Sequence, residues 1–256
     1  MAQALLAADE PSPVRMLRPD GASPFFLTAD HAGRAIPRRL GDLGLSAGDL
    51  ERHIAWDIGI AGVTERLAAA LDATAVLQTY SRLMIDCNRD PSWISAIPTL
   101  SESTRIPGNE DLTEADRDQR RREIFTPYHA AITEQLDFRH QRPTLLVAMH
   151  SFTPVFKGVG RRVEAGVLYN PNDRDLRLPH IMLELLRAEG DLVIGDNEPY
   201  AITDASDYTV PVHGEARGLP HVEIEIRQDL IADAAGQAAW ADRLARLLPR
   251  ALQALR

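Results

Sequence analysis

The sequence predicts an α/β fold, in one domain with a mixed, mostly parallel sheet and helices on both faces of the sheet. First, short apolar runs alternate with amphipathic stretches from about residue 24 onward, which is typical of strands and helices that follow one another along a chain. Second, several apolar runs end in polar groups, as expected where strands point their carboxyl ends at a ligand site. Third, the 256 residues are 45% hydrophobic and 25% charged, a composition that supports a sizeable core.

The first part of the chain is predicted to contain an irregular arm, a strand and a long helix. Residues 1–23 place prolines and acidic residues after a very short apolar stretch, so we expect an arm without regular structure, followed by one domain over residues 24–256. The run "PFFLTAD" at 24–30 is apolar and ends in polar residues, which favours a strand that opens into a loop. A helix is expected over 46–73, with Ser46 as its capping residue.

The middle of the chain is predicted to carry two strands, a long loop and a charged helix. Apolar and β-branched content favours strands over 74–79 and 82–86. Prolines and serines over 90–111 indicate a long loop, and long loops in compact domains are often functional. Residues 113–141 are predicted to form one charged helix, or two helices broken before Pro127, because proline removes a helical hydrogen bond.

The last part of the chain is predicted to complete the sheet and to end in a helix. The run "HVEIEI" alternates polar and apolar residues, which indicates a strand with one buried face. The closing stretch has apolar residues at helical spacing. The expected elements are strands at 144–149, 165–170, the start of 191–200 and 221–226, and helices within 171–190 and at 234–256.

Charge and cysteine content restrict the possible partners and compartment. The formal charge is −9, from 28 basic and 37 acidic residues, which argues against nucleic-acid binding because that needs a basic face. The longest apolar runs fall short of the ~20 residues that span a membrane. The single cysteine, Cys87, excludes an internal disulfide and fits a reducing compartment. We therefore expect a cytoplasmic protein, without a signal peptide, whose partner is a small molecule rather than a nucleic acid or a membrane.

Chemically active groups follow five of the apolar runs. One or two such endings would be chance, whereas five argue for a polar site along one edge of the sheet. The groups are Asp30 with His31, Asp86 with Asn88 and Arg89, His150, Asp196 with Asn197 and Glu198, and Glu225 with Arg227.

His31 and His150 are candidate metal ligands. Each alone is explained as well by a loop or core histidine that hydrogen-bonds to the backbone, but two at strand ends favour a metal, because imidazole is a common zinc ligand. A catalytic zinc needs three protein ligands and an open position. Asp57 lies in an apolar stretch beside Trp56, where a carboxylate is costly unless it is paired with an arginine or bound to a cation. His53, one helical turn earlier, is a competing third ligand.

Arginine and glutamate side chains supply candidate catalytic groups. Asn88 and Arg89 come just after a predicted strand, and a guanidinium there suits a substrate carboxylate or, alternatively, a surface acid. Glu223 and Glu225 share one face of their strand, and Arg227 follows on the same face. Glu225 is nearer the strand end, so we favour it over Glu223 as a general base.

Seven motifs, taken in order, resemble one enzyme family. They are "TADHAGRAIP", "HIAWDIG", "YSRLMIDCNRDP", "MHSFTP", "GVLYN", "DNEPYA" and "YTVPVHGEARGLPHVEIEIRQDLI". Together they resemble the N-formylglutamate amidohydrolase family from about residue 24 to residue 250, and more distantly the zinc carboxypeptidases and the aspartoacylase group. The resemblance implies a three-layer, phosphorylase/hydrolase-like α/β fold with one zinc ion.

The resemblance also implies roles for individual residues. The wider superfamily begins its zinc site with an H-x-x-E motif, but here Arg34 stands at the glutamate position after His31. Asp57 is the expected replacement, with His150 as the last zinc ligand. Glu225 resembles the superfamily's catalytic glutamate, and "IDCNR" resembles the asparagine–arginine pair that grips the substrate and polarises its carbonyl group.

The expected activity is therefore zinc-dependent cleavage of N-formyl-L-glutamate into formate and glutamate. Glu225 and Arg89 are the expected catalytic residues, and Asn88, Arg227 and Arg161 or Arg162 are expected to hold carboxylates, with His213 lining the pocket. Two alternatives stay open: a related deacylase or peptidase with another substrate, and a non-catalytic binder of N-acyl amino acids. Nickel, cobalt and iron also suit two histidines and one aspartate.

Overall fold

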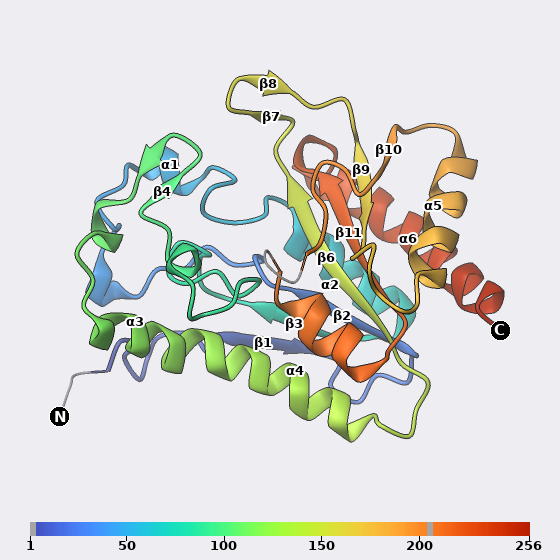
Figure 1. Cartoon of the computed structure of the whole chain (residues 1–256), viewed down its shortest axis with the longest axis horizontal. Helices are drawn as coiled ribbons and strands as arrows, with labels where there is room; N and C mark the ends of the chain where they lie inside the picture. The colour runs from blue at the N-terminus through green and yellow to red at the C-terminus, as the bar shows by residue number, and fades with distance from the viewer. Residues whose placement is uncertain (1–3, 204–206) are drawn as a thin grey trace.

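A seven-stranded sheet forms the centre of the molecule (Figure 1). The computed structural model describes residues 4–203 and 207–256. The strand order is β1-β3-β2-β6-β11-β9-β10. The bounds are Val14–Leu17 for β1, Phe25–Ala29 for β2, Thr74–Gln78 for β3, Leu145–Phe152 for β6, Ala165–Leu168 for β9, Ile194–Asp196 for β10 and His221–Arg227 for β11.

The four central strands run in one direction. β2 pairs in parallel with β3 and with β6, and β6 pairs in parallel with β11. β1 is antiparallel to β3, β9 is antiparallel to β11, and β10 is parallel to β9. The predicted mixed, mostly parallel sheet is confirmed, and the carboxyl ends of β2, β6 and β11 meet at one edge.

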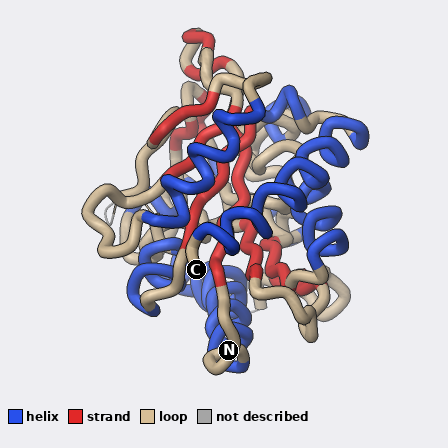
Figure 2. The backbone as a smooth tube through the Cα atoms, turned by 90° about the vertical axis from the view of Figure 1, so that its right-hand side faces the viewer, coloured by secondary structure: helices blue, strands red, loops and turns tan. Residues whose placement is uncertain are grey.

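Helices cover both faces of this sheet (Figures 1 and 2). On one face, α2, α5 and α6 pack on apolar strand residues such as Leu27 and Val147. On the other face, α4 packs on Phe26 and Leu146. The bounds are Ile60–Leu71 for α2, Arg177–Glu189 for α5, Ala234–Ala254 for α6 and Thr126–Phe138 for α4. Strand residues therefore alternate between two apolar layers, as fully buried parallel strands do.

The arm predicted for residues 1–23 is not irregular throughout. Val14–Leu17 form β1, which pairs antiparallel with β3 at the sheet edge. This strand is short and only partly buried, so its sequence lacks the long apolar run that marks the central strands. Pairing with a strand far along the chain determines its conformation.

The long helix predicted over 46–73 is divided. Ser46 caps the short helix α1, Ala47–Leu50, by accepting a hydrogen bond from the Asp49 amide as predicted, and α2 begins at Ile60. Gly59, between them, has a φ of +83°, and a Cβ there would lie 2.1 Å from the carbonyl oxygen of Ile231. Since only glycine tolerates both conditions, the chain breaks before α2 and Asp57 lies in the connecting segment.

The strand predicted over 82–86 is wrong. This stretch forms turns, and the Met84 amide donates to the Ser81 carbonyl. Leu83, Met84 and Ile85 are all buried in the core beneath the second face of the sheet. An apolar run of this length signals burial, whether the backbone is a strand or a turn.

The charged helix predicted over 113–141 continues through a local distortion. Glu114–Arg120 form α3, capped by Thr113 in a capping box with Asp116, and Arg121–Phe125 form a π-helical turn before α4. Pro127 stands in the first turn of α4. Because proline cannot donate to the preceding turn, the wider π-helical turn accommodates it without ending the helix.

Shorter elements lie between the main helices and strands. Two small hairpins are β4–β5 and β7–β8, the first of them inside the predicted 90–111 loop. Their strands are Leu100–Ser101, Thr104–Arg105, Val155–Phe156 and Val159–Gly160. Short 3₁₀ segments are Arg38–Leu40, Ile94–Ala96, Pro107–Asn109, Glu215–Arg217 and Gln228–Leu230, and Val210–Gly214 is π-helical.

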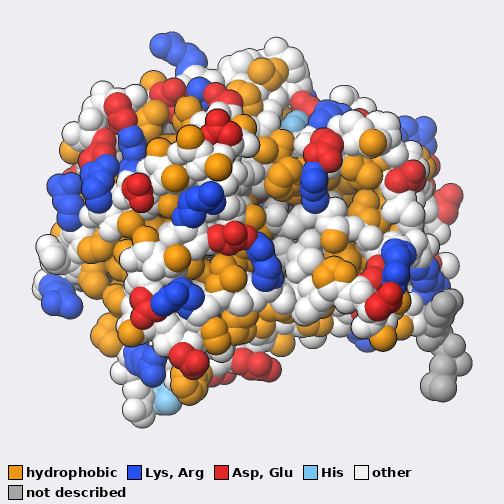
Figure 3. All heavy atoms as spheres, turned by 180° about the vertical axis from the view of Figure 1, so that it is seen from behind, with side chains coloured by type: hydrophobic (Ala, Val, Ile, Leu, Met, Phe, Trp, Pro, Cys, Tyr) orange, Lys and Arg blue, Asp and Glu red, His pale blue; other side chains and the backbone are white. Residues whose placement is uncertain are grey.

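The charge distribution on the surface and the character of the helices are relevant to the partners expected from the sequence. On the face shown in Figure 3, basic and acidic side chains are interspersed. As far as the structure describes it, this face has no continuous basic patch of the kind that binds nucleic acid. Among the described residues, no helix has both the length and the apolar character needed to cross a membrane.

Candidate metal centre and active site

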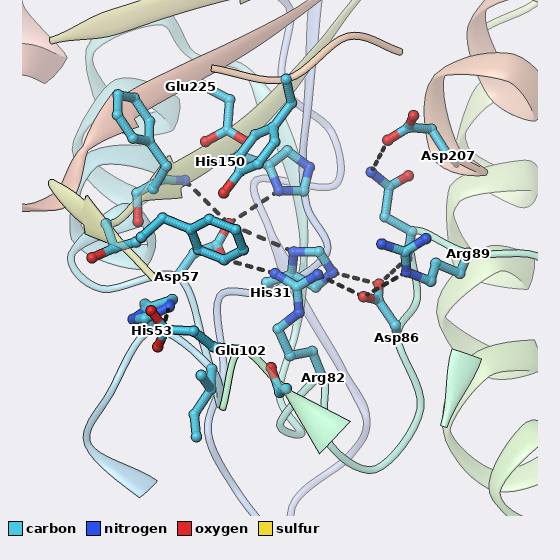
Figure 4. Close-up of a pocket in the computed structure, with 18 of the residues that line it drawn as sticks. His31, His53, Asp57, Arg82, Asp86, Arg89, Glu102, His150, Asp207 and Glu225 are labelled. Atoms are coloured by element: carbon cyan, nitrogen blue, oxygen red, sulfur yellow. Dashed lines mark hydrogen bonds and ion pairs between the residues drawn. The ribbon is translucent and has the colours of Figure 1, made fainter. Parts of the chain in front are cut away.

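A cavity of about 540 Å³ opens at the carboxyl ends of β2, β6 and β11 (Figure 4). Several predicted site residues line it: His31, Asp57, Asn88, Arg89, His150, Glu223 and Glu225. Aromatic and aliphatic side chains also line it, among them Phe152, Phe156, Tyr200 and Leu100. Residues that are far apart in the sequence therefore share one cavity.

His31, Asp57 and His150 form a buried group with the composition of a metal site. Their ligand atoms all lie within 4.8 Å of one another. The Nδ1 atom of His150 is 3.0 Å from Asp57 Oδ2, and the Nδ1 atom of His31 is 3.6 Å from the same oxygen. The Asp57 amide donates to the His31 carbonyl oxygen, which ties the two segments together beside the end of β6.

This donor set fits a zinc-like divalent cation. The buried Nδ1 atom of His31 has no hydrogen-bond partner, which is unfavourable unless another group occupies its lone pair. Two imidazoles and one carboxylate are three protein ligands, the number that leaves a position open on a catalytic zinc. His53, the competing third ligand, lies elsewhere in the cavity wall, with Nε2 3.6 Å from Glu102. The geometry therefore favours Asp57.

Each imidazole has a second carboxylate behind it. The Nε2 atom of His31 is 2.6 Å from Asp86 Oδ1, and the Nε2 atom of His150 is 3.3 Å from Asp30 Oδ2. Histidine ligands of metals commonly donate from their other ring nitrogen to a carboxylate, which orients the ring. His31 Nε2 makes this hydrogen bond, whereas His150 Nε2 is at ion-pair distance from its carboxylate. The sequence analysis placed Asp30 and Asp86 at strand ends but gave them no role. Pairing each candidate ligand with a nearby aspartate would have suggested one.

The carboxylates control the protonation of both imidazoles. Burial and the Arg82 guanidinium disfavour a charged His31, but the two aspartates beside it outweigh both and raise its pKa. Burial likewise opposes charge on His150, but the surrounding carboxylates, that of Glu223 first, raise its pKa well above the usual value. In return, His150 offsets the burial of Asp30 and lowers the pKa of that carboxyl to about 2. Surroundings that favour imidazolium ions also favour a divalent cation, which must displace those protons to bind.

Arg82 is a site residue that the sequence analysis missed. Its Nη2 atom is 2.6 Å from Asp86 Oδ2, its Nη1 atom is 3.5 Å from Asp57 Oδ1, and it lines the cavity (Figure 4). Arg89 also approaches Asp86, at 3.5 Å from its Nε atom. Two guanidinium groups thus face the cavity. The four-residue spacing between Arg82 and Asp86 is the feature of the sequence that could have identified Arg82.

Glu225 and Glu223 both face the cavity, and their surroundings differ. Glu225 is the register partner of His150 across β6 and β11. Burial raises the pKa of both carboxyls. The pKa of Glu225 rises to about 7, and the pKa of Glu223 rises well above its usual value. Glu223 Oε2 lies 3.9 Å from His150 Nε2, behind the ring. A group with a pKa near neutrality is best suited to proton transfer, and this is the ground for preferring Glu225 to Glu223.

Three predicted binding residues are not among the side chains that line the cavity. Arg227 pairs with Asp229 and Glu164, because β11 ends there and these two carboxylates lie beside its guanidinium group. His213 is buried against His129, with 2.9 Å between Nε2 and Nδ1. The substrate role of Arg227 and His213 stays a prediction. Arg162, the alternative to Arg161, is exposed.

Arg161 contacts the cavity only through its wall. Its guanidinium group donates to the Tyr200 hydroxyl at 2.8 Å and lies over the rings of Phe156 and Tyr200. Both rings line the cavity. Arg34, at the position of the superfamily's glutamate, instead pairs with Glu51 near the surface. It takes no part in the candidate metal group.

Comparisons with known proteins agree with this architecture. The profile of the N-formylglutamate amidohydrolase family matches residues 23–232. The structure of gene product Atu2144 from Agrobacterium tumefaciens is similar over 98% of this chain and 99% of that chain, with 39% identity and a TM-score of 0.92. The N-formylglutamate amidohydrolase from Ralstonia eutropha JMP134 is similar over 94% of this chain and 98% of its own, with 21% identity and a TM-score of 0.68. No curated protein matches the chain.

Proposed function

Because the chain belongs to the N-formylglutamate amidohydrolase family, a family of amide hydrolases, we propose that it is a zinc-dependent hydrolase that cleaves N-formyl-L-glutamate into formate and glutamate. The observation that carries this proposal is the convergence of His31, Asp57 and His150 in one cavity with Glu225. We also propose a cytoplasmic location, in keeping with the single buried cysteine.

The candidate ligands would hold one divalent cation through the Nδ1 atoms of His31 and His150 and the carboxylate of Asp57. A cation bound there supplies Lewis acidity toward the amide carbonyl and lowers the pKa of water. Asp86 and Asp30 keep the two rings in place from behind. These residues act on the cation and not on the substrate.

Glu225 performs the proton transfers in this proposal. Its carboxylate accepts a proton from the attacking water and delivers it to the nitrogen of the leaving glutamate. The C–N bond breaks as the new C–O bond completes formate. A pKa of about 7, caused mainly by burial, lets Glu225 take up and release this proton near neutral pH.

The two cavity arginines bind and polarise the substrate. Arg82 is held by Asp57 and Asp86 in the cavity wall, where it is suited to stabilise negative charge that develops on the carbonyl oxygen. Arg89, which the sequence analysis expected to be catalytic, is in this proposal assigned to a substrate carboxylate, since a guanidinium group can bind both of its oxygens. In both roles the guanidinium group is already held in position by neighbouring aspartates.

A related deacylase is the second candidate function. The cavity wall carries the apolar side chains of Phe152, Phe156 and Leu100, which could accommodate an acyl group larger than formyl. The proposed catalytic groups would be unchanged. This candidate differs from the first only in which N-acyl amino acid is turned over fastest.

The test begins with untagged protein, because a histidine tag would bind metal itself. Bound metal is measured by mass spectrometry, and formate release from N-formyl-L-glutamate is measured before chelation, after chelation and after zinc is restored. We expect one metal per chain and release that disappears and returns with zinc. Metal without release, followed by turnover of a bulkier N-acyl glutamate, would favour the second candidate. Metal without any turnover would favour a binding protein.

The general base is tested with two matched variants on one strand. Glu225→Gln is expected to lower kcat by about 10²–10⁴-fold, the usual contribution of a general base, and to keep the metal. Glu223→Gln is expected to have the smaller effect on kcat. The reverse order would assign the base to Glu223.

A further inference from the structure

We propose that Asn88 and Thr209 are positioning residues, which join the carboxylates behind the two candidate metal-binding imidazoles into one hydrogen-bonded network. This inference rests on the proposed metal centre. It gives Asn88 a role other than the substrate contact expected from the sequence, and it gives Thr209 a role where the sequence suggested none.

The first part of the network lies behind His31. Asp86 Oδ1 is 2.6 Å from His31 Nε2 and accepts a hydrogen bond from the backbone amide of Asn88 at 2.9 Å. Arg82 binds the other oxygen of the same carboxylate. Asp86 is therefore held on both sides, and Asn88 stands directly behind it.

The second part lies behind His150. Asp30 Oδ2 is 3.3 Å from His150 Nε2, and Asp30 Oδ1 accepts a hydrogen bond from the Thr209 hydroxyl at 2.9 Å. Thr209 and Asp30 are almost completely buried. Thr209 is thus a direct partner of the carboxylate that orients the His150 ring.

The Asn88 side chain connects these two parts. Its Oδ1 atom accepts hydrogen bonds from the amides of Tyr208 and Thr209, each at 3.0 Å, and its Nδ2 atom donates to Asp207 at 3.1 Å. An asparagine side chain can accept two hydrogen bonds and donate two. Its carbonyl oxygen is therefore fully used, and at most one N–H remains for a substrate.

A pair of histidines holds the same segment from its other end. His129 Nε2 lies 2.8 Å from the Cys87 carbonyl oxygen, so it carries the proton and donates. His129 Nδ1 must then accept from His213 Nε2, at 2.9 Å. Residues 207–214 are thus fastened to the chain just before Asn88 and to the Asn88 side chain itself.

Metal affinity should consequently depend on how residues 207–214 dock. If the Thr209 hydroxyl is lost, Asp30 loses a hydrogen bond that holds it against His150, and the ring is free to turn away from the ligand position. Groups behind metal ligands typically contribute 10–100-fold to metal affinity. A residue that only contacts substrate would leave the affinity for metal unchanged.

The experiment measures zinc binding directly. Metal-free wild-type protein, Thr209→Val and Thr209→Ser are each titrated with Zn²⁺ in competition with a chromophoric chelator. Valine keeps the shape of threonine without its hydroxyl, and serine keeps the hydroxyl. We expect Thr209→Val to weaken zinc binding by about 10-fold or more, and Thr209→Ser to restore most of the affinity.

The matched control is Thr64→Val, which removes another buried hydroxyl. Thr64 is in α2, and its hydroxyl donates to the Ile60 carbonyl oxygen of the same helix and not to a carboxylate behind a candidate ligand. It should leave zinc affinity unchanged. Equal zinc affinities for Thr209→Val, Thr64→Val and the wild type would overturn the inference. The Co²⁺ absorption spectrum of each protein provides a second reading of ligand geometry, which should change only in Thr209→Val.

Asn88→Ala separates positioning from substrate binding. We expect weaker zinc binding, with KM for N-formyl-L-glutamate close to the wild-type value once zinc is saturating. A raised KM with unchanged zinc affinity would make Asn88 a substrate-binding residue. That result would overturn this inference and leave the proposed function in place. Wild-type protein that binds no Zn²⁺ would instead overturn the proposed function, and the inference with it.

Discussion

Two pairs of buried histidines lie on the same side of the sheet, and their surroundings give them opposite properties. His31 and His150 meet edge to face, with ring centroids 5.0 Å apart, and His129 and His213 stack with centroids 5.2 Å apart. All four rings are at least nine-tenths buried. The pKa values of the first pair are raised, whereas burial lowers the pKa of His129 to about 4 and that of His213 to about 3.

Neighbouring groups account for the difference. The first pair is surrounded by carboxylates, which outweigh the cost of burying a charge. The second pair has the Cys87 carbonyl oxygen and the rings of Phe125 and Tyr208 beside it. The carboxylate of Asp30, which acts on both of its rings, does not offset burial. The comparison teaches that burial alone does not set the protonation of a buried histidine, because the carboxylates around it can outweigh burial.

The largest expected effect comes from removing one histidine of each pair. His150→Gln should weaken zinc binding by more than about 100-fold, the upper limit for groups that lie behind ligands, since it removes a ligand itself. His129→Gln should weaken zinc binding much less than His150→Gln does, because it removes one attachment of residues 207–214 and no ligand, and glutamine can still donate to the Cys87 carbonyl oxygen. Equilibrium zinc titration of both variants checks this. Similar losses in the two variants would erase the proposed distinction between the pairs.

Metal addition should stabilise the protein through the first pair. At a free zinc concentration of 100 times Kd, binding to the folded state contributes about 2.7 kcal/mol, or a rise in Tm of roughly 5–10 °C for a chain of this size. At one fixed zinc concentration, the rise in Tm should be larger at pH 8 than at pH 6. The reason is that the imidazole pKa values are raised, so protons compete with the metal at the lower pH. Thermal unfolding with zinc and with a chelator measures the rise, and a shift that shrinks with increasing pH would contradict the assignment.

Acid should destabilise the protein through the second pair. A histidine whose folded pKa is lowered binds fewer protons folded than unfolded, so stability is lost as pH falls below the unfolded pKa of about 6.5. For His129, with a folded pKa of about 4, this loss is roughly 2 kcal/mol between pH 6.5 and 5.

Urea unfolding at several pH values, with chelator present, measures the loss for wild-type protein and for His129→Gln. In metal-free protein the first pair has the opposite sign: its raised pKa values contribute stability below pH 6.5 that is lost as pH rises through the folded values. Subtracting the variant isolates the contribution of His129. A wild-type–variant difference that stays constant from pH 6.5 to 5 would show that His129 is not buried as a neutral ring.

The smallest effect is expected at Arg227, which lies outside the carboxylate surroundings of the first pair. Arg227→Ala should leave KM and zinc affinity unchanged and lower the free energy of unfolding by at most about 1 kcal/mol, since partly exposed ion pairs contribute little. Arg89→Ala, in the cavity wall, is the comparison and should raise KM. Steady-state kinetics of both variants decide between them. A raised KM in Arg227→Ala would support the substrate role that the sequence suggested.

Sequence patterns predicted the central sheet well because the signal there is local. The strands β2, β3 and β6 are mainly apolar, β11 alternates polar and apolar residues, and all four are close in extent to the predicted runs. β11 is buried on both faces rather than on one as predicted. The errors occur where partners far along the chain set the backbone. β1 exists because β3 pairs with it, and residues 82–86 turn because the core encloses them.

For the site, the sequence by itself determined which chemical groups follow the strands of the sheet. Because parallel strands deliver their ends to one edge, His31, His150 and Glu225 were expected to meet, and they do share one cavity. The motifs also determined the family. Both conclusions depend on residue type and spacing, which are present in the linear chain.

Only the tertiary structure decided which of these groups act on one another. It placed Arg82 between Asp57 and Asp86, and it turned Arg227 toward surface carboxylates. It also put carboxylates around one histidine pair and a carbonyl oxygen beside the other. The reason is physical: protonation and metal binding depend on charges within a few ångströms, and the fold brings those charges from segments distant in sequence.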